Sequence, residues 1–198
     1  MKKDYVVIFM LFAVLVMCLG LRAYTGGEQK ANIHWITKAA ERGNVDAQHY
    51  LGVCYLTGQN VEKNPKQGLH WLTKAAEQGN ADSQYLTGLC YYEGEGTSKN
   101  LTEAVSWFTK AAEHQQRGAE YCLGICYLKG QGVEQNIKKA VSLLKSAAEH
   151  GVAEAQHDLA LCYQHGIGVK KDKQRAREWY RQAAGQGHEG AKKALHEL

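Results

Sequence analysis

Apolar residues recur at helical spacing along most of this chain, and the complete pattern returns every 36 residues. In the stretch LGVCY, Leu51, Cys54 and Tyr55 lie one helical turn apart, which places them on one face of an α-helix. The stretch returns as TGLCY, LGICY and LALCY, with cysteines at Cys54, Cys90, Cys126 and Cys162 and tyrosines at Tyr55, Tyr91, Tyr127 and Tyr163. The pattern therefore predicts the same helix in each of four equal units.

A second apolar face follows in each unit after a turn. Trp71, Leu72, Ala75 and Ala76 form it in the first unit, and equivalent residues recur in the others. Between the two faces stand two columns: the glycines Gly58, Gly94, Gly130 and Gly166, and the polar residues Asn64, Asn100, Asn136 and Asp172. Glycine adopts the left-handed conformation that ends many helices, and Asn or Asp side chains cap helix starts. Each unit is therefore predicted to be two antiparallel helices.

A single pair of helices cannot bury both of its apolar faces, so the units must stack. The expected fold class is all-α, a right-handed α/α superhelical solenoid of helix-turn-helix repeats. Its predicted divisions are a half-repeat at 28–46, full repeats at 47–82, 83–118, 119–154 and 155–190, and a capping helix at 191–198.

Residues 1–27 differ from the rest of the chain. Lys2 and Lys3 precede an uncharged run from Tyr5 to Leu21, and Arg22 closes it. At about 1.5 Å per residue such a helix would span roughly 26 Å, slightly less than a typical hydrocarbon core. The segment is predicted to be a signal peptide or an N-terminal membrane anchor. An uncleaved anchor, a cleaved signal and a lipoprotein signal ending at Cys18 all stay open.

Each of these alternatives places the remaining chain outside the cytoplasm if positive charge stays inside. The expected location is the inner membrane with the repeats facing the periplasm, or the periplasm or medium after cleavage. The net charge is only +4, from 24 basic and 20 acidic residues, and beyond the N-terminal lysines the charges are dispersed. A nucleic-acid binder concentrates basic residues on one face, so no nucleic-acid partner is expected.

The repeat resembles Sel-one-like repeats, relatives of tetratricopeptide repeats. The stretches AQHYLGVCYLTGQNVEKNPKQGLHWLTKAAEQG and AQHDLALCYQHGIGVKKDKQRAREWYRQAAGQG carry the resemblance, which covers about residues 31–198. It implies a scaffold or adaptor for other proteins, without shared catalytic residues. One branch, the cysteine-rich proteins of Helicobacter, has a disulfide in each repeat, and some members are β-lactamase-like. Ala75, Ala76 and Gln84 stand at the places of that cysteine pair, so its framework is absent here.

Alignment of the first helices with tetratricopeptide repeats predicts which residues face the concave side. His49, Tyr85, Tyr121 and His157 form one column whose apolar bodies and polar tips suit a protein-binding surface, although they could also only fill space between helices. An extended peptide or a partner helix is the expected ligand. The predicted contact residues are Asp46, His49, Val53, Leu56, Asp82, Tyr85, Leu89, Tyr92, Tyr121, Ile125, Leu128, Glu154, His157, Leu161 and Gln164.

Candidate chemistry changes this prediction little. Cys162 and His165 have a spacing that metal ligands can use, but no second cluster completes a site, so no metal is expected. The turns GEG, GQG and GIG lack the context of a phosphate loop, and no cofactor or catalytic residue is predicted. Neighbouring helices pack about 8–10 Å apart, whereas disulfides need α-carbons within about 7 Å. The regular cysteines are therefore predicted to be buried thiols.

These observations predict a non-catalytic scaffold or adaptor, exported or membrane-tethered, that binds a protein or peptide on its concave face. Two alternatives stay open. One is a secreted β-lactamase-like hydrolase of the cysteine-rich repeat type, and the other is a structural spacer of the cell envelope.

Overall fold

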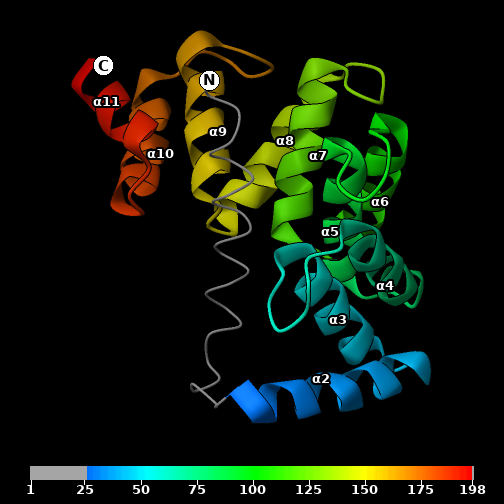
Figure 1. The fold of residues 1–198 in the computed structure, drawn as a ribbon. Coiled ribbons are helices and arrows are strands. Elements are labelled where there is room, and N and C mark those ends of the chain that lie inside the picture. The colour runs from blue at the N-terminus through cyan, green and yellow to red at the C-terminus, as the bar shows by residue number, and fades with distance from the viewer. Residues whose placement is uncertain (1–25, 198) are drawn as a thin grey trace.

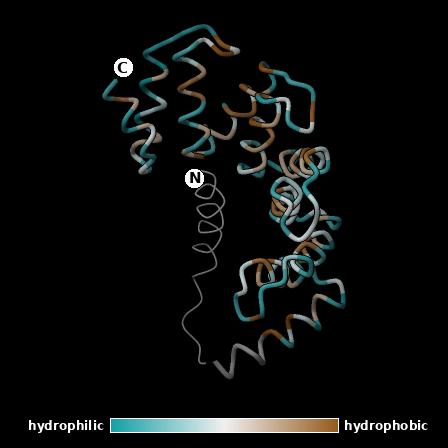
Figure 2. The backbone as a smooth tube through the Cα atoms, turned by 45° about the horizontal axis from the view of Figure 1, so that its top comes forward, coloured by the Kyte–Doolittle hydropathy of each residue, from teal (hydrophilic) through white to brown (hydrophobic). Residues whose placement is uncertain are grey.

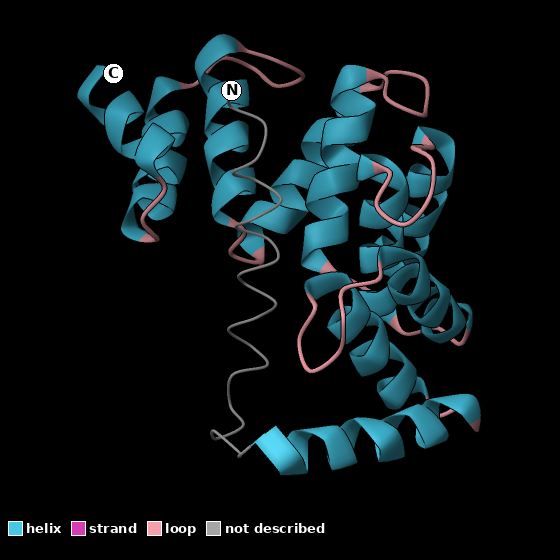
Figure 3. Ribbon diagram, viewed as in Figure 1, coloured by secondary structure: helices cyan, strands magenta, loops and turns pink. Residues whose placement is uncertain are grey.

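The computed structural model describes residues 26–197 as an array of helices, with no strand in that range (Figures 1 and 3). The predicted all-α repeat solenoid is confirmed. The helices are α2 (Gly26–Glu41), α3 (Val45–Thr57), α4 (Pro65–Glu77), α5 (Ala81–Glu93), α6 (Leu101–Glu113), α7 (Arg117–Lys129), α8 (Ile137–Glu149), α9 (Ala153–His165), α10 (Lys173–Gly185) and α11 (Glu189–Glu197). We call α3, α5, α7 and α9 the first helices of the units and α4, α6, α8 and α10 the second helices.

The helix boundaries follow from local chemistry. Each first helix ends at a glycine with positive φ, between 66° at Gly130 and 81° at Gly94. Each second helix begins after a side-chain cap, such as Asn100, whose Oδ1 accepts from the Glu103 amide at 3.1 Å. Both predicted columns are therefore confirmed. A further set of caps, Asn44, Asn80 and Gln116, starts the first helices of three units, while Val152 stands at this place in the fourth without a side-chain cap bond.

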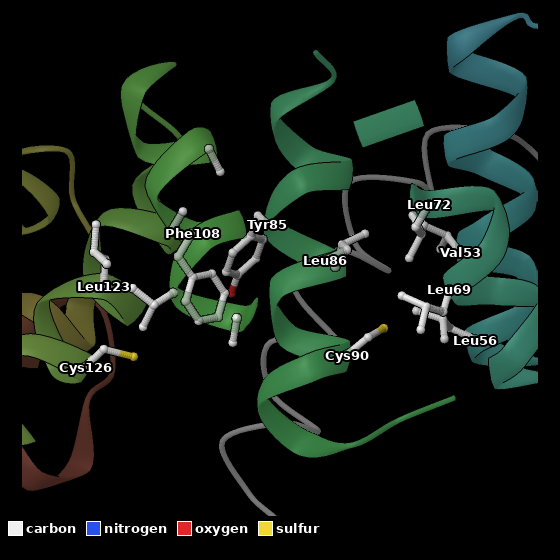
Figure 4. Packing of buried hydrophobic residues seen from close by; sticks show 14 residues of the cluster. Val53, Leu56, Leu69, Leu72, Tyr85, Leu86, Cys90, Phe108, Leu123 and Cys126 are labelled. Carbon is white, nitrogen blue, oxygen red and sulfur yellow. The ribbon is translucent and has the colours of Figure 1, made fainter. Parts of the chain in front are cut away.

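Each helix packs against the next along the chain, and the units form a curved array that Figure 2 shows as an arc. In its first half, α3 and α5 lie on the inner side of α4 and α6 (Figure 1). The core continues from unit to unit (Figure 4): Val53 and Leu72 of the first unit face Leu86 of the second, and Phe108 leads on towards Leu123. The hydrophobic core is therefore distributed along the array, because each unit buries its apolar faces against its neighbours.

The regular cysteines lie on this buried face, as predicted. Cys54, Cys90, Cys126 and Cys162 are all nearly inaccessible, and within residues 26–197 the cysteines are thiols rather than disulfides. Burial raises the pKa of Cys90 to about 12 and the pKa values of Cys126 and Cys162 to about 11. Because a thiolate is costly in apolar surroundings, these groups stay protonated at neutral pH and serve as small packing residues.

A buried amide joins three of the four units to the one before it. Gln48 Nε2 donates to the Ala40 carbonyl at 2.9 Å, and Gln84 and Gln156 make the same bond across eight residues at 3.1 Å. Ala76 and Gln84, which stand at the places of the cysteine pair in the cysteine-rich Helicobacter proteins, are thus joined by a hydrogen bond. This column was not singled out from the sequence, although glutamine stands at this place in three of the four units.

The third unit departs from this amide column. Glu120 replaces glutamine there and has no N–H to offer a carbonyl. Its buried carboxylate instead accepts from Ser146 Oγ at 2.8 Å and lies 3.1 Å from His150 Nδ1. The contact is therefore made to the second helix of its own unit, α8, and to the His150 cap that follows it.

Among residues 26–197, no helix is both long and apolar enough to cross a membrane. The predicted signal or anchor, residues 1–27, lies almost entirely outside the part of the chain that the structure describes, and only its last two residues belong to α2.

Candidate interaction surface

The first helices lie side by side and carry the column of His49, Tyr85, Tyr121 and His157, which we call the aromatic strip. His49 Nδ1 on α3 lies 2.8 Å from Ser83 Oγ on α5, so the strip begins with a contact between successive units. Burial lowers the pKa of His49 below its ordinary value of 6.5, although the carboxylates of Asp82 and Asp46 act in the opposite direction. His49 is therefore neutral at pH 7, which suits a hydrogen bond to a hydroxyl.

Tyr85 belongs to the core more than to the surface. Only 7% of it is exposed, and its ring lies 6.2 Å from that of Phe108, centroid to centroid. Burial raises its pKa, and the neighbouring Cys122 thiol raises it further. Gly118 on α7 makes room for the ring, because a Cβ there would stand 2.8 Å from Tyr85 Cζ. Tyr85 therefore fills space between α5 and α7.

The second half of the strip is a connected polar network. Tyr121 on α7 donates its hydroxyl to Asp158 Oδ2 on α9 at 3.1 Å. The other oxygen of Asp158 lies 2.9 Å from His157 Nδ1. The His157 ring stacks on His188, with centroids 4.5 Å apart, and His188 Nδ1 accepts from the Ala191 amide at the start of α11. One carboxylate thus links α7 to α9, and a ring pair links α9 to the terminal helix.

The remaining predicted residues differ in what they offer a partner. Val53 and Leu56 are buried within the core. Leu89, Ile125, Leu128 and Leu161 are half-buried and give a row of apolar side chains along the first helices. Tyr92 and Gln164 are half-buried but engaged: the Tyr92 hydroxyl donates to Gln131 at 2.9 Å, and Gln164 accepts from Tyr180 at 2.6 Å. The open apolar surface is therefore the row containing Leu89 and Ile125.

Acidic residues stand beside this row. Asp46 and Asp82 are exposed and Glu154 is half-buried. Within residues 26–197 none of the three pairs with a lysine or arginine; Asp82 instead accepts from the Gln116 amide at 3.3 Å. On the second helices, Lys74 and Lys110 lie over the rings of Trp71 and Trp107. The first-helix face therefore presents uncompensated negative charge next to apolar area.

Sequence reasoning missed three residues that organise this face: Ser83, Asp158 and His188. Asp158 was detectable, because it is the single charged residue in a column otherwise occupied by Tyr50, Leu86 and Cys122. Nothing in the sequence marked the other two, since a serine and a histidine at helix ends are common. Over the described range there is no group of three or more potential metal ligands.

Comparison with known families agrees with this architecture. The model of the Sel1 repeat matches residues 33–44, 45–80, 81–115, 118–152 and 153–188, which is most of the chain. The chain belongs to the Sel1 repeat family. Proteins with Sel1 repeats are generally protein-interaction scaffolds. A search of curated proteins finds no significant match.

Solved structures include close relatives of this Sel1 repeat array. A protective antigen of uropathogenic Escherichia coli with an SLR fold is 31% identical, with a TM-score of 0.82 over 85% of this chain and 36% of that one. A Sel1 repeat protein from Oxalobacter formigenes is 36% identical, with a TM-score of 0.77 over 86% of this chain and 49% of that one. The chain thus spans less than half the length of either relative. Cysteine-rich protein B of Helicobacter pylori, 24% identical with a TM-score of 0.52 over 67% of this chain and 96% of that one, shares the fold.

Proposed function

We propose that this Sel1 repeat protein is a non-catalytic scaffold that binds another protein on its first-helix face. The observation that carries the proposal is the row of half-buried apolar side chains, including Leu89 and Ile125, beside acidic residues that lack a lysine or arginine partner in residues 26–197. Apolar area next to unpaired charge is typical of surfaces that associate with proteins.

The chemistry of the buried residues favours binding over catalysis. A cysteine nucleophile needs a lowered pKa and access to substrate, whereas burial raises the pKa of Cys90, Cys126 and Cys162. The aromatic strip is occupied in joining helices to one another, which gives the face a fixed shape. A preformed face loses little conformational entropy on binding and therefore suits a scaffold.

Site-directed photo-crosslinking in the native host tests the proposal. A photoreactive amino acid at position 82 or 89 should capture a defined partner, whereas the same group at Ser106, exposed on the second helix α6, should not. Asp82→Lys should weaken the capture from position 89. Equal yields from position 106, or adducts only with abundant bystanders, would contradict the assignment, and the second result would favour a structural spacer. Tyr85 is unsuitable for this test, because replacing it would damage the core.

We further propose that the repeats lie outside the cytoplasm, tethered to the inner membrane by residues 1–27 or released after their cleavage. The apolar run from Tyr5 to Leu21 behind two lysines supports this location. Fractionation combined with protease treatment of spheroplasts tests it: the repeats should be digested without lysis. Protection until the membrane is broken would contradict the proposal.

A further inference from the structure

Helix α2, at the start of the array, exposes a tryptophan whose equivalents in the next two units are buried. Trp35 in HWITKAA and Trp71 in HWLTKAA occupy equivalent places, and Trp107 follows in the next unit. Trp71 and Trp107 are each 8% exposed, whereas Trp35 is 68% exposed. Trp71 packs against Ala40 and Leu51, that is, against the preceding second helix and the first helix of its own unit. Within residues 26–197 no corresponding first helix precedes α2, so the Trp35 ring lies open.

Cationic residues accompany Trp35 on the same face of α2. Trp35, Lys38 and Arg42 follow one another at intervals of three and four residues, and all are exposed. Lys38 Nζ lies 5.4 Å from the centre of the Trp35 ring. The other side of the helix, with Ile36 and Ala40, packs towards Leu51 of α3. We call Trp35, Lys38 and Arg42 the outer stripe of α2, which lies at the end of the array (Figure 1).

One occupant of this stripe could be the chain itself, since the repeat register extends upstream. Cys18 stands 36 residues before Cys54, in the place of a first helix. Val16, however, then falls on the column of Gly52, where even a Cβ would stand 2.7 Å from Leu72 Cγ. Arg22 falls on the column of Gly58, which has a φ of +78°. A valine at the closest helix contact and an arginine at a left-handed position do not fit a packed first helix.

The length of the connecting chain favours a membrane surface instead. Residues 22–25 separate the apolar run from Gly26, the start of α2. Four residues reach at most about 14 Å when fully extended. A run that ends in the bilayer at Leu21 therefore holds the start of α2 within the reach of the lipid headgroups. Tryptophan is enriched at this depth, and lysine and arginine are attracted to anionic headgroups.

We propose that the outer stripe of α2 lies against the membrane, with Trp35 at the headgroup level and Lys38 and Arg42 on anionic phosphates. This inference rests on the proposed tether of residues 1–27. It adds a second, peripheral contact, which fixes the direction in which the array leaves the membrane. An array held by a flexible tether alone would have no fixed direction.

Tryptophan quenching in vesicles tests this contact. The full chain is reconstituted in phosphatidylcholine vesicles with and without phosphatidylglycerol, and lipids brominated near the headgroup serve as quenchers. Quenching is expected for a fluorescence component that Trp35→Phe removes, and not for the component that Trp71→Phe removes. Lys38→Glu together with Arg42→Glu should abolish most of the quenching that depends on phosphatidylglycerol. Lys74→Glu, the matched change in the next unit, should leave it unchanged.

The outcomes separate the contact from the tether. A chain that does not float with vesicles refutes the tether and with it the inference. A chain that floats while Trp35 is quenched by aqueous iodide and not by brominated lipid refutes the contact and leaves the tether in place. Shielding of Trp35 from both quenchers also refutes the contact and indicates a protein cover. If the shielding disappears when the protein is diluted in lipid, the covering protein is a second copy of the chain. If the shielding persists, residues 11–22 of the same chain cover Trp35.

Discussion

The two helices of a unit pack tightly at a glycine, and the neighbours of that glycine predict unequal effects for one substitution at two equivalent places. Gly88 on α5 faces Phe108 on α6, and a Cβ at Gly88 would stand 2.6 Å from two carbons of the Phe108 ring. The ring is fully buried and cannot turn away. At Gly124 the nearest atom is Leu144 Cγ at 3.2 Å, a distance that a shift of a few tenths of an ångström relieves.

Two terms decide the free energy of unfolding in each variant. Alanine is favoured over glycine inside a helix by about 1 kcal/mol, and overpacking a core costs about 1–3 kcal/mol. For Gly88→Ala the clash with an aromatic ring puts the cost at the upper end, so a net loss of about 1–2 kcal/mol is expected. For Gly124→Ala the two terms nearly cancel. The fourth unit carries Ala160 at this place naturally, fully buried.

Thermal unfolding of the full-length protein, followed by circular dichroism, measures the difference. With roughly 2–4 °C per kcal/mol for a chain of this size, Gly88→Ala should lower the midpoint by several degrees and Gly124→Ala by little or nothing. In a Phe108→Ala background, Gly88→Ala should no longer destabilise, because the ring that it meets is gone. Equal midpoints for the two alanine variants, or no change of effect in the Phe108→Ala background, would refute the proposed role of the ring.

Three other features, the buried glutamines, His49 and the buried cysteines, also have measurable consequences. Gln156→Met should lower the free energy of unfolding by about 1–3 kcal/mol in denaturant titration, because it leaves the Ala148 carbonyl and the Gln186 amide without their partner. Gln84→Met should cost less, because Gln84 Oε1 accepts no hydrogen bond from the described residues; a larger loss there would count against this reasoning. Because burial lowers the pKa of His49, the unfolded chain binds its proton first, so stability should fall as pH drops below about 6.5. His49→Gln should flatten that part of the pH profile of the melting temperature. Cys90, Cys126 and Cys162, with pKa values raised to about 11–12, should react with iodoacetamide at pH 8 much more slowly than after unfolding; rapid native labelling would contradict their role as packing residues.

The sequence by itself determined the array. Period, helix ends and buried faces follow from residues that act within one unit, such as Gly94 at a left-handed stop and Asn100 at a cap. These are local interactions, and their recurrence in four units distinguishes the pattern from a chance similarity. The cysteine column was likewise interpretable, because its spacing excludes cross-links and its helical face points to the core.

The tertiary structure decided which residues of the first-helix face are available to a partner. Tyr85 and Tyr121 occupy the same sequence column, yet one is buried against Phe108 and the other donates to Asp158. The difference arises from the neighbouring unit, which offers Gly118 to the first and a carboxylate to the second. Trp35 and Trp71 diverge for the same reason, since among residues 26–197 only Trp71 has a first helix to cover it. Exposure in a repeat array depends on what the adjacent unit contributes, and a repeat pattern alone does not contain that contact.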